Sequence, residues 1–141
     1  MYQLNRARVN PADIIVVYCS IIRSVLEYAC PVWHCGLTLT QTKDIENVQR
    51  RCLRIIYPDL SYSDALFVSG LERLDARRQI ITKNTFQDIR NSDNVINNLI
   101  DLYRREPCSH ISRSKYDLVL PLTKTNRYLN SFFPYCIRNK F

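Results

Sequence analysis

Glycine is scarce in this sequence, since only two of its 141 residues are Gly. Gly-rich phosphate loops, turn-rich β-sandwiches and flexible linkers all need residues that adopt positive φ without strain, so this composition argues against them. Long apolar runs are also missing. The longest, from Ile14 to Ile22, is interrupted by Cys19 and Ser20 and reaches about half of the roughly 20 residues that a membrane-spanning helix needs. We therefore expect a helical protein without a transmembrane segment.

Histidine is equally rare, and this limits the chemistry that the chain can perform. Cys30, His34 and Cys35 are too few for a structural zinc site, which takes four ligands, and Cys108 and His110 do not complete the set at a recognisable spacing. The sequence also does not indicate which cysteine could act as a catalytic nucleophile with which histidine as its base. The close carboxylates with which polymerases hold two magnesium ions are not found on any strand-like run. We expect no enzyme activity, no metal and no cofactor.

The N-terminal region has some features of a secretory signal, because Arg6 and Arg8 precede the apolar run. Pro11 and Asp13 instead open that run as they would open a helix, and Glu27 stands where a small-residue cleavage site is needed. We therefore expect an intracellular protein, in the cytoplasm or nucleus, that is not secreted. Its six cysteines are then expected to be free thiols.

What the sequence does contain is enough apolar material for a core and a clear helical period. Hydrophobic residues make up 46% of the chain, and a chain of this length buries about 70% of its unfolded surface without metal or disulfide support. Apolar residues recur at i, i+3 and i+4 from Pro11 to about Ala29, which predicts a first long helix. The expected core residues are Tyr18, Ile21, Leu26, Tyr28, Trp33, Leu53 and Ile56.

A second helix is expected from a cap at Thr40 or Thr42 to a point before Pro58. It has two distinct faces. Ile45, Val48, Cys52, Leu53, Ile55 and Ile56 lie on one side, and Lys43, Asn47, Arg50, Arg51 and Arg54 fall within an arc of roughly 100° on the other.

Shorter patterns complete the expected architecture. Ser61 and Asp64 predict the start of a short helix that stops at Gly70, and two further helices are predicted over 72–91 and 95–105. After Pro107 the helical period fades, residues 118–122 alternate as an extended segment, and Pro134 interrupts the last aromatic cluster. The predicted fold class is mainly α: a small bundle of four to five helices, residues 1–106, with an extended basic and aromatic tail, residues 107–141, packed on it.

The net charge of +7 is unevenly distributed. Residues 1–60 hold 7 basic and 5 acidic groups, residues 61–110 hold 7 of each, and residues 111–141 hold 6 basic groups and 1 acidic group. The basic tail also carries Tyr116, Tyr128, Phe132, Phe133 and Tyr135. This composition is typical of a strip that contacts nucleic acid, or of a solvated tail whose aromatic side chains hold it against the body.

Four groups of residues, in order along the chain, carry a family resemblance. The first is Leu4-Asn5-Arg6-Ala7, then Asp13, Tyr18 and Arg23, with the block VLEYACPVWH at 25–34. The second is QRRCLRII at 49–56. Gly70-Leu71 with Leu74 and Arg77-Arg78 comes next, and RYLNSFFPYCIR at 127–138 comes last. Together they resemble the region just after the catalytic palm in reverse transcriptases of non-LTR retrotransposons. The likeness covers nearly the whole chain, although Glu72-Arg73 replaces the expected Pro-containing turn.

The resemblance implies a helical thumb, with the segment that follows it, which grips template and primer behind the palm. The palm with its Asp pair and the family's endonuclease domain are not in this sequence, so we expect Met1 to be an internal start and the chain to be a catalytically incomplete fragment of an RNA-directed DNA polymerase. The expected partner is the backbone of RNA, DNA or a hybrid duplex, and no membrane. The candidate nucleic-acid-binding residues are Lys43, Arg50, Arg51, Arg54, Arg77, Arg78, Lys124, Arg127 and Arg138.

Other hypotheses stay open at this point. Residues 25–56 also resemble the small helical N-terminal extension of AlkB-type tRNA-modifying and alkylation-repair dioxygenases, but the His-x-Asp iron motif of those enzymes is missing. A helical protein-interaction module would use the apolar stripe of the first helix for partners or for self-association. A non-functional relic of a mobile element would have no activity, and a basic helix face can simply be solvated.

Overall fold

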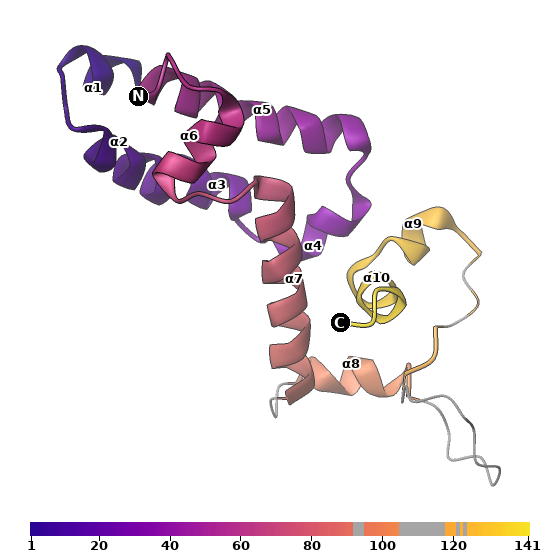
Figure 1. Ribbon diagram of the computed structural model, residues 1–141. Coiled ribbons are helices and arrows are strands. Elements are labelled where there is room, and N and C mark those ends of the chain that lie inside the picture. Colours follow the sequence, from indigo (N-terminus) through magenta and orange to yellow (C-terminus); the bar gives the residue numbers. More distant parts are fainter. Residues whose placement is uncertain (92–94, 105–117, 121, 123) are drawn as a thin grey trace, which may run out of the picture. The chain divides into compact units, whose positions relative to one another are not determined.

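The computed structural model describes residues 1–91, 95–104, 118–120, 122 and 124–141 (Figure 1). The described chain is mainly helical, as expected, and its one pairing of extended backbone is an isolated bridge between Arg104 and Leu118. It divides into two compact units. Unit 1 comprises Met1–Cys30 and Leu37–Gln79, and unit 2 comprises Pro31–Gly36 and Ile80–Phe141. This division differs from the expected boundary after residue 106.

The first helical segment of unit 1 is confirmed, with an irregular middle. After α1 (Tyr2–Arg6), α2 (Pro11–Val17) starts with Pro11 in its first turn and with the Asn10 side chain accepting from the Ala12 amide. The chain continues through a π-helix, η1 (Tyr18–Arg23), into α3 (Ser24–Glu27). A π-helix has more residues per turn than an α-helix, so it changes the direction of every side chain that follows.

This change of phase explains errors in the expected core. Tyr18 at the start of η1 is buried as expected, but Ile21 is 61% exposed. Tyr28 lies beyond the end of α3 on non-helical backbone and is 80% exposed. Leu26 and Trp33 are half-buried. Ile21 and Tyr28 were therefore wrong as core residues, because a straight α-helical wheel was applied to a segment that does not follow one.

The second long helix, α5 (Leu39–Ile56), lies alongside α2 and α3 (Figure 1). Its start was predicted slightly too late. Thr38, not Thr40 or Thr42, is the cap, in a reciprocal capping box with Gln41. Leu53 and Ile56 are buried as expected, in a core with Ile14 of α2 and Ala65 of α6.

The short helix α6 (Tyr62–Ser69) confirms both of its predicted ends. The Ser61 side chain accepts from the Asp64 amide, and Gly70 has φ 64°, the left-handed conformation that ends a helix with little strain in glycine. The next helix, α7 (Leu74–Asn91), is also confirmed, and it starts two residues later than expected.

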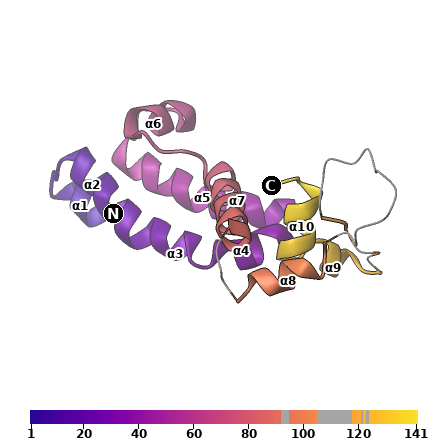
Figure 2. The ribbon, with the colours of Figure 1, turned by 90° about the horizontal axis from the view of Figure 1, so that it is seen from below.

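Unit 2 contains the second half of α7 together with short helices. These are α4 (Cys30–Trp33), which begins at the last residue of unit 1, a 3-10 turn η2 (His34–Gly36), α8 (Asn97–Asp101), α9 (Asn126–Leu129) and α10 (Phe132–Arg138). The core of the unit joins α7, α8 and α10 through Phe86, Ile89, Ile100 and Cys136 (Figure 2). The predicted helix over 95–105 is thus reduced to the short α8.

The prediction of an extended tail was wrong for residues 126–138. Thr125 caps α9, and Pro134 lies in the first turn of α10, where a missing amide hydrogen costs no helical bond. Phe132 and Phe133 pack edge-on against Phe86, with ring centroids 6.2 and 6.5 Å away. The described aromatic side chains therefore hold this segment in place. Tyr116 and parts of the predicted extended segment lie outside the described residues.

Candidate nucleic-acid interface

Four cations of the predicted set lie together on α5. Lys43, Arg50, Arg51 and Arg54 are all exposed, and none of them forms an ion pair with a carboxylate in the described part of the chain. The rise of an α-helix places them along about 16 Å of its axis. These residues define the basic face of α5.

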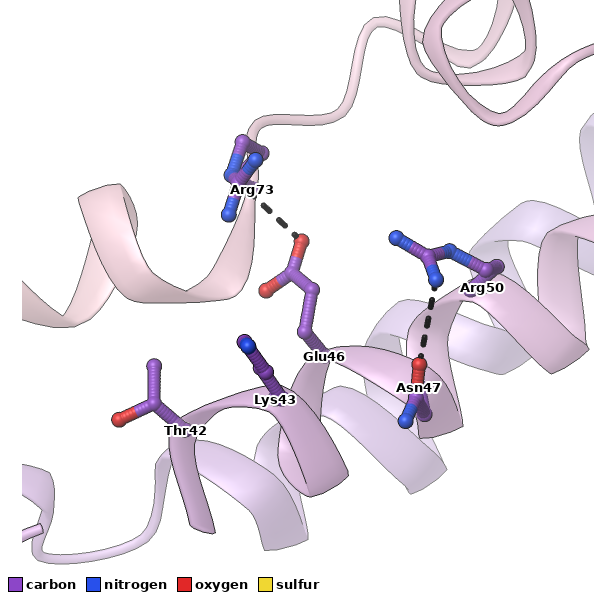
Figure 3. Close-up of a pocket in the computed structure, with 6 residues that line it drawn as sticks. All are labelled: Thr42, Lys43, Glu46, Asn47, Arg50 and Arg73. Atoms are coloured by element: carbon purple, nitrogen blue, oxygen red, sulfur yellow. Dashed lines mark hydrogen bonds and ion pairs between the residues drawn. The ribbon is translucent and has the colours of Figure 1, made fainter. Parts of the chain in front are cut away.

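A pocket of about 370 Å³ opens beside the N-terminal half of this face (Figure 3). It is lined by Thr42, Lys43, Glu46, Asn47 and Arg50 of α5 and by Arg73, the residue before α7. Figure 3 shows Arg73 reaching toward Glu46 from the far side of the pocket. Cations therefore approach the pocket from two different elements.

Glu46 has a structural role in the floor of this pocket. It is only 4% exposed, and its Oε2 accepts from the amide of Leu74 at 3.0 Å, so it caps the start of α7. Its Oε1 accepts from the hydroxyl of Tyr62, and Arg73 Nε lies 4.0 Å away. Burial, and then the hydrogen bond to Glu46, raise the pKa of Tyr62, which keeps its hydroxyl protonated as a donor.

Gln49 extends this arrangement into a buried polar network. Its Oε1 accepts from Tyr18 at 2.7 Å, and its Nε2 donates to Tyr62 at 3.1 Å and to the Glu72 carbonyl at 2.9 Å. Neither Glu46 nor Gln49 was predicted from the sequence as a site residue. Their signal was present, because on a helical wheel they share the apolar side of α5 with Leu53 and Ile56, where a polar residue needs a partner.

Arg50 is held in one orientation by two contacts. Its guanidinium carbon lies 4.8 Å from the centroid of the Tyr62 ring, and Nη1 donates to Asn47 Oδ1 at 3.3 Å. A planar guanidinium supported in this way loses less conformational entropy when it binds an anion.

Arg73, which was not among the predicted site residues, is fixed in a similar way. Its Nε and Nη2 each lie 3.0 Å from a carboxylate oxygen of Asp75. The hydrogen bonds from Arg73 hold the pKa of Asp75 below its usual range. The proximity of Arg73 to α5 could not be deduced from spacing, since it depends on the path of the chain after α6.

The prediction that Arg77 and Arg78 of α7 contact nucleic acid is not consistent with the surroundings of these side chains. Arg78 is 0% exposed, so it lies in the interior and does not present a surface for phosphate. Burial lowers the pKa of Arg78, and the nearby carboxylates of Glu46 and Asp75 oppose that shift. Arg77 is half-buried, and its Nε lies 2.6 Å from Glu27 Oε1 on α3.

The remaining predicted cations belong to unit 2. Lys124 and Arg127 are exposed at the start of α9. Arg138 is exposed too, near the Tyr135 ring at 5.7 Å and the Asn130 side chain at 3.4 Å. They form a second basic region that is separate in sequence from the basic face of α5.

Within residues 1–91, 95–104, 118–120, 122 and 124–141, no group of three or more His, Cys, Asp or Glu side chains could hold a metal ion. No single helix in the same ranges is long and apolar enough to cross a membrane; residues 11–27 and 30–36 meet that test only when taken together as a bent pair. Cys30, Cys52 and Cys136 are buried free thiols, and Cys19 is a half-buried one. The buried thiol of Cys35 lies 3.9 Å from the Pro31 carbonyl oxygen.

Comparisons with models of protein families, with curated proteins and with solved structures find no significant match to this chain.

Proposed function

We propose that this chain binds the sugar-phosphate backbone of nucleic acid through the basic face of α5, inside the cell and without a catalytic role of its own. The observation that carries the proposal is the row of four exposed cations, Lys43, Arg50, Arg51 and Arg54, without carboxylate partners among the described residues. Such a role is what the resemblance to the post-palm region of non-LTR retrotransposon reverse transcriptases leads us to expect. We also propose that the chain is a catalytically incomplete fragment of such an enzyme.

The dimensions of the face suit a nucleic-acid strand. One strand of a duplex advances about 3.4 Å along the duplex axis per phosphate while it also turns around that axis, so about 16 Å of helix can lie opposite a few successive phosphates. Contacts of this kind release condensed counterions and carry no base information. We therefore expect binding that is strongly dependent on salt and weakly dependent on sequence.

Fluorescence anisotropy with labelled DNA, RNA and hybrid duplexes over a series of salt concentrations tests the proposal. Each phosphate contact contributes about 0.9 to the slope of log K against log salt, so R50Q/R54Q should reduce that slope by about two and weaken binding at low salt. The matched control is K83Q/R90Q, which removes the same charge from exposed positions of α7 in unit 2. Equal losses in the two double variants, or affinity that does not depend on salt, would contradict the proposal.

A second candidate function is protein interaction, and a specific observation favours it. Ile21, Val25 and Tyr28 are 61%, 72% and 80% exposed along η1, α3 and the residue after α3. An apolar row of this kind is typical of surfaces that meet a partner or a second copy. Light scattering over a dilution series tests this candidate. Self-association that is lost in I21S/V25S supports it, and a monomer that is unchanged by concentration contradicts self-association.

A further inference from the structure

The pocket beside α5 differs from the rest of the basic face in the directions from which its cations come. Lys43 and Arg50 project from α5, whereas Arg73 comes from the chain segment before α7 and lies across the pocket (Figure 3). A continuous strand lying along α5 would follow the row of Lys43, Arg50, Arg51 and Arg54. An anionic group that enters between Arg73 and α5 meets cations on two sides.

The charge and chemistry of the lining favour a phosphate monoester over a diester. Three cations and one carboxylate line the pocket, and Glu46 is already occupied by Tyr62 and by the Leu74 amide. A monoester exposes three oxygens and carries about −1.5 to −2 charge at neutral pH, whereas a backbone diester offers two oxygens and one charge. Three cations from two elements can therefore engage a monoester more completely.

Two of these cations are already held in fixed orientations. Arg50 is supported by the Tyr62 ring and Asn47, and Arg73 is clamped through Nε and Nη2 by Asp75, which leaves Nη1 without a hydrogen bond to any described residue. A volume of about 370 Å³ is at the lower end of the range for small-ligand pockets, and it accommodates a phosphate with its attached sugar. The pocket is thus preorganised for a small phosphorylated group.

The position of the pocket indicates where that group comes from. Lys43 and Arg50 belong both to the pocket and to the basic face, and Arg51 and Arg54 continue from them toward the C-terminal end of α5. A strand whose end sits in the pocket can place its next phosphates on Arg51 and Arg54. A free phosphorylated metabolite would not contact Arg51 and Arg54.

We propose that the pocket formed by Lys43, Arg50 and Arg73 binds the terminal phosphate monoester of a nucleic-acid strand, whose following phosphates lie along Arg51 and Arg54. The inference rests on the proposed function and names the part of the nucleic acid that this site selects.

The test compares oligonucleotides of one sequence that end in phosphate or in hydroxyl, at the 5′ or the 3′ end, with a fluorescent label at the opposite end. Anisotropy should show about tenfold tighter binding for at least one phosphorylated form, since additional charge-assisted hydrogen bonds distinguish it. R73Q should bring this ratio close to one. Because Arg73 also supports Asp75 and Glu46, K43Q serves as a second variant, at an exposed residue without an ion pair in the described chain.

R54Q is the matched control on the same face, since Arg54 does not line the pocket. It should weaken binding of the phosphate and hydroxyl forms equally and leave their ratio unchanged. Equal, salt-dependent binding of both forms by the unmodified chain would overturn this inference and leave the proposed function in place. Loss of salt dependence for both forms would overturn the proposed function instead. A nucleoside monophosphate should compete away the preference, whereas its binding in the absence of any preference would assign the pocket to a free phosphate ester and overturn the strand-end proposal.

Discussion

The two units of this chain stabilise their helices by different kinds of contact. In unit 1 an aliphatic core around Ile14, Leu53 and Ile56 is joined to a buried network of directional hydrogen bonds. In unit 2 the contacts among the described residues are mainly aromatic, centred on Phe86. Hydrogen bonds fix the angle and register of each helix, whereas aromatic packing depends chiefly on buried area and tolerates small adjustments.

The difference explains why the better-defined candidate site belongs to unit 1. Glu46 and Tyr62, which hold the start of α7 and the Arg50 side chain, are members of the polar network. Two of the three cations that line the pocket, Arg50 and Arg73, are therefore in contact with side chains of this buried network. In unit 2 the exposed Arg127 belongs to a helix of four residues and the exposed Lys124 precedes the cap of that helix, and neither has comparable support among the described contacts.

The largest expected effect comes from breaking the aromatic core of unit 2. Phe86 is buried and packs edge-on against both Phe132 and Phe133, so F86A should cost about 3–5 kcal/mol. Trp33, the single tryptophan of the chain, belongs to unit 2, and its fluorescence during urea unfolding reports on that unit. We expect the fluorescence midpoint to fall further than the midpoint of the far-ultraviolet circular dichroism.

The control for this variant is F67A, because Phe67 on α6 is 88% exposed and its loss should change stability by less than about 0.5 kcal/mol. Coincident fluorescence and circular dichroism transitions in F86A would contradict the expectation that unit 2 loses more stability than unit 1.

The polar network of unit 1 gives the next effect. E46Q removes the charge that caps α7 and weakens the acceptor for Tyr62, so a loss of about 1–3 kcal/mol is expected from urea unfolding. A double-mutant cycle with Y62F should show a coupling energy above about 0.5 kcal/mol. D44N changes a neighbouring exposed carboxylate of α5 and should be nearly neutral. Equal losses in E46Q and D44N would show that the network does not contribute.

Alkaline pH should weaken unit 2 through a buried thiol. Burial, and to a smaller extent Cys35, raise the pKa of Cys136 to about 12, well above the value of about 8.5 for a free thiol. A folded-state pKa above the unfolded one gives a contribution that is complete below about pH 8.5 and is lost as pH rises toward the folded value. The fluorescence-monitored stability should therefore fall between about pH 9 and pH 11, by at most about 1.4 kcal/mol per pH unit.

The variant C136A should make this decline less steep, whereas C19A, at a half-buried cysteine of unit 1, should leave it unchanged. An unchanged slope in C136A would assign the alkaline loss to other groups.

The smallest expected effect is a gain of stability at the end of α3. Ala29 has φ 49°, a left-handed conformation that costs a side-chain-bearing residue about 1–2 kcal/mol. A29G should relieve this strain and stabilise the chain by about 0.5 kcal/mol, once the greater freedom of glycine in the unfolded state is subtracted. The comparison is A76G in the first turn of α7, which should destabilise by up to about 1 kcal/mol. A thermal midpoint that falls in A29G would contradict the expectation.

Local signals in the sequence were sufficient for much of the fold and for part of the site. Apolar periodicity located α5 and α7, and Ser61 and Gly70 correctly marked the ends of α6. The basic face of α5 also followed from periodicity, because an exposed helix face depends only on spacing. The inclusion of Pro134 in α10 was not foreseen, since a proline is compatible with a helix only within its first turn and the start of that helix was not recognised.

The errors arose where tertiary contacts decide the outcome. A helical wheel drawn from the sequence does not show that the π-helix at 18–23 turns Ile21 toward solvent. Nor does it show that Arg78 is buried or that Arg73 reaches α5. Each depends on how segments distant in sequence pack together, which hydrophobic spacing does not encode. The pocket itself was therefore not predictable, although Lys43 and Arg50, two of its five residues on α5, were predicted as binding residues.

Tyr62 connects the surface of unit 1 to its interior, and this connection should affect the motion of α6 when a ligand binds. One side of its ring supports Arg50 at the surface, while its hydroxyl takes part in the buried network with Glu46 and Gln49. An anion that restrains Arg50 therefore also restrains Tyr62, the first residue of α6, and this effect does not require any change in the core. Amide hydrogen exchange in α6 should slow when a ligand occupies the basic face, so a helix without a predicted ligand-binding residue would report on binding.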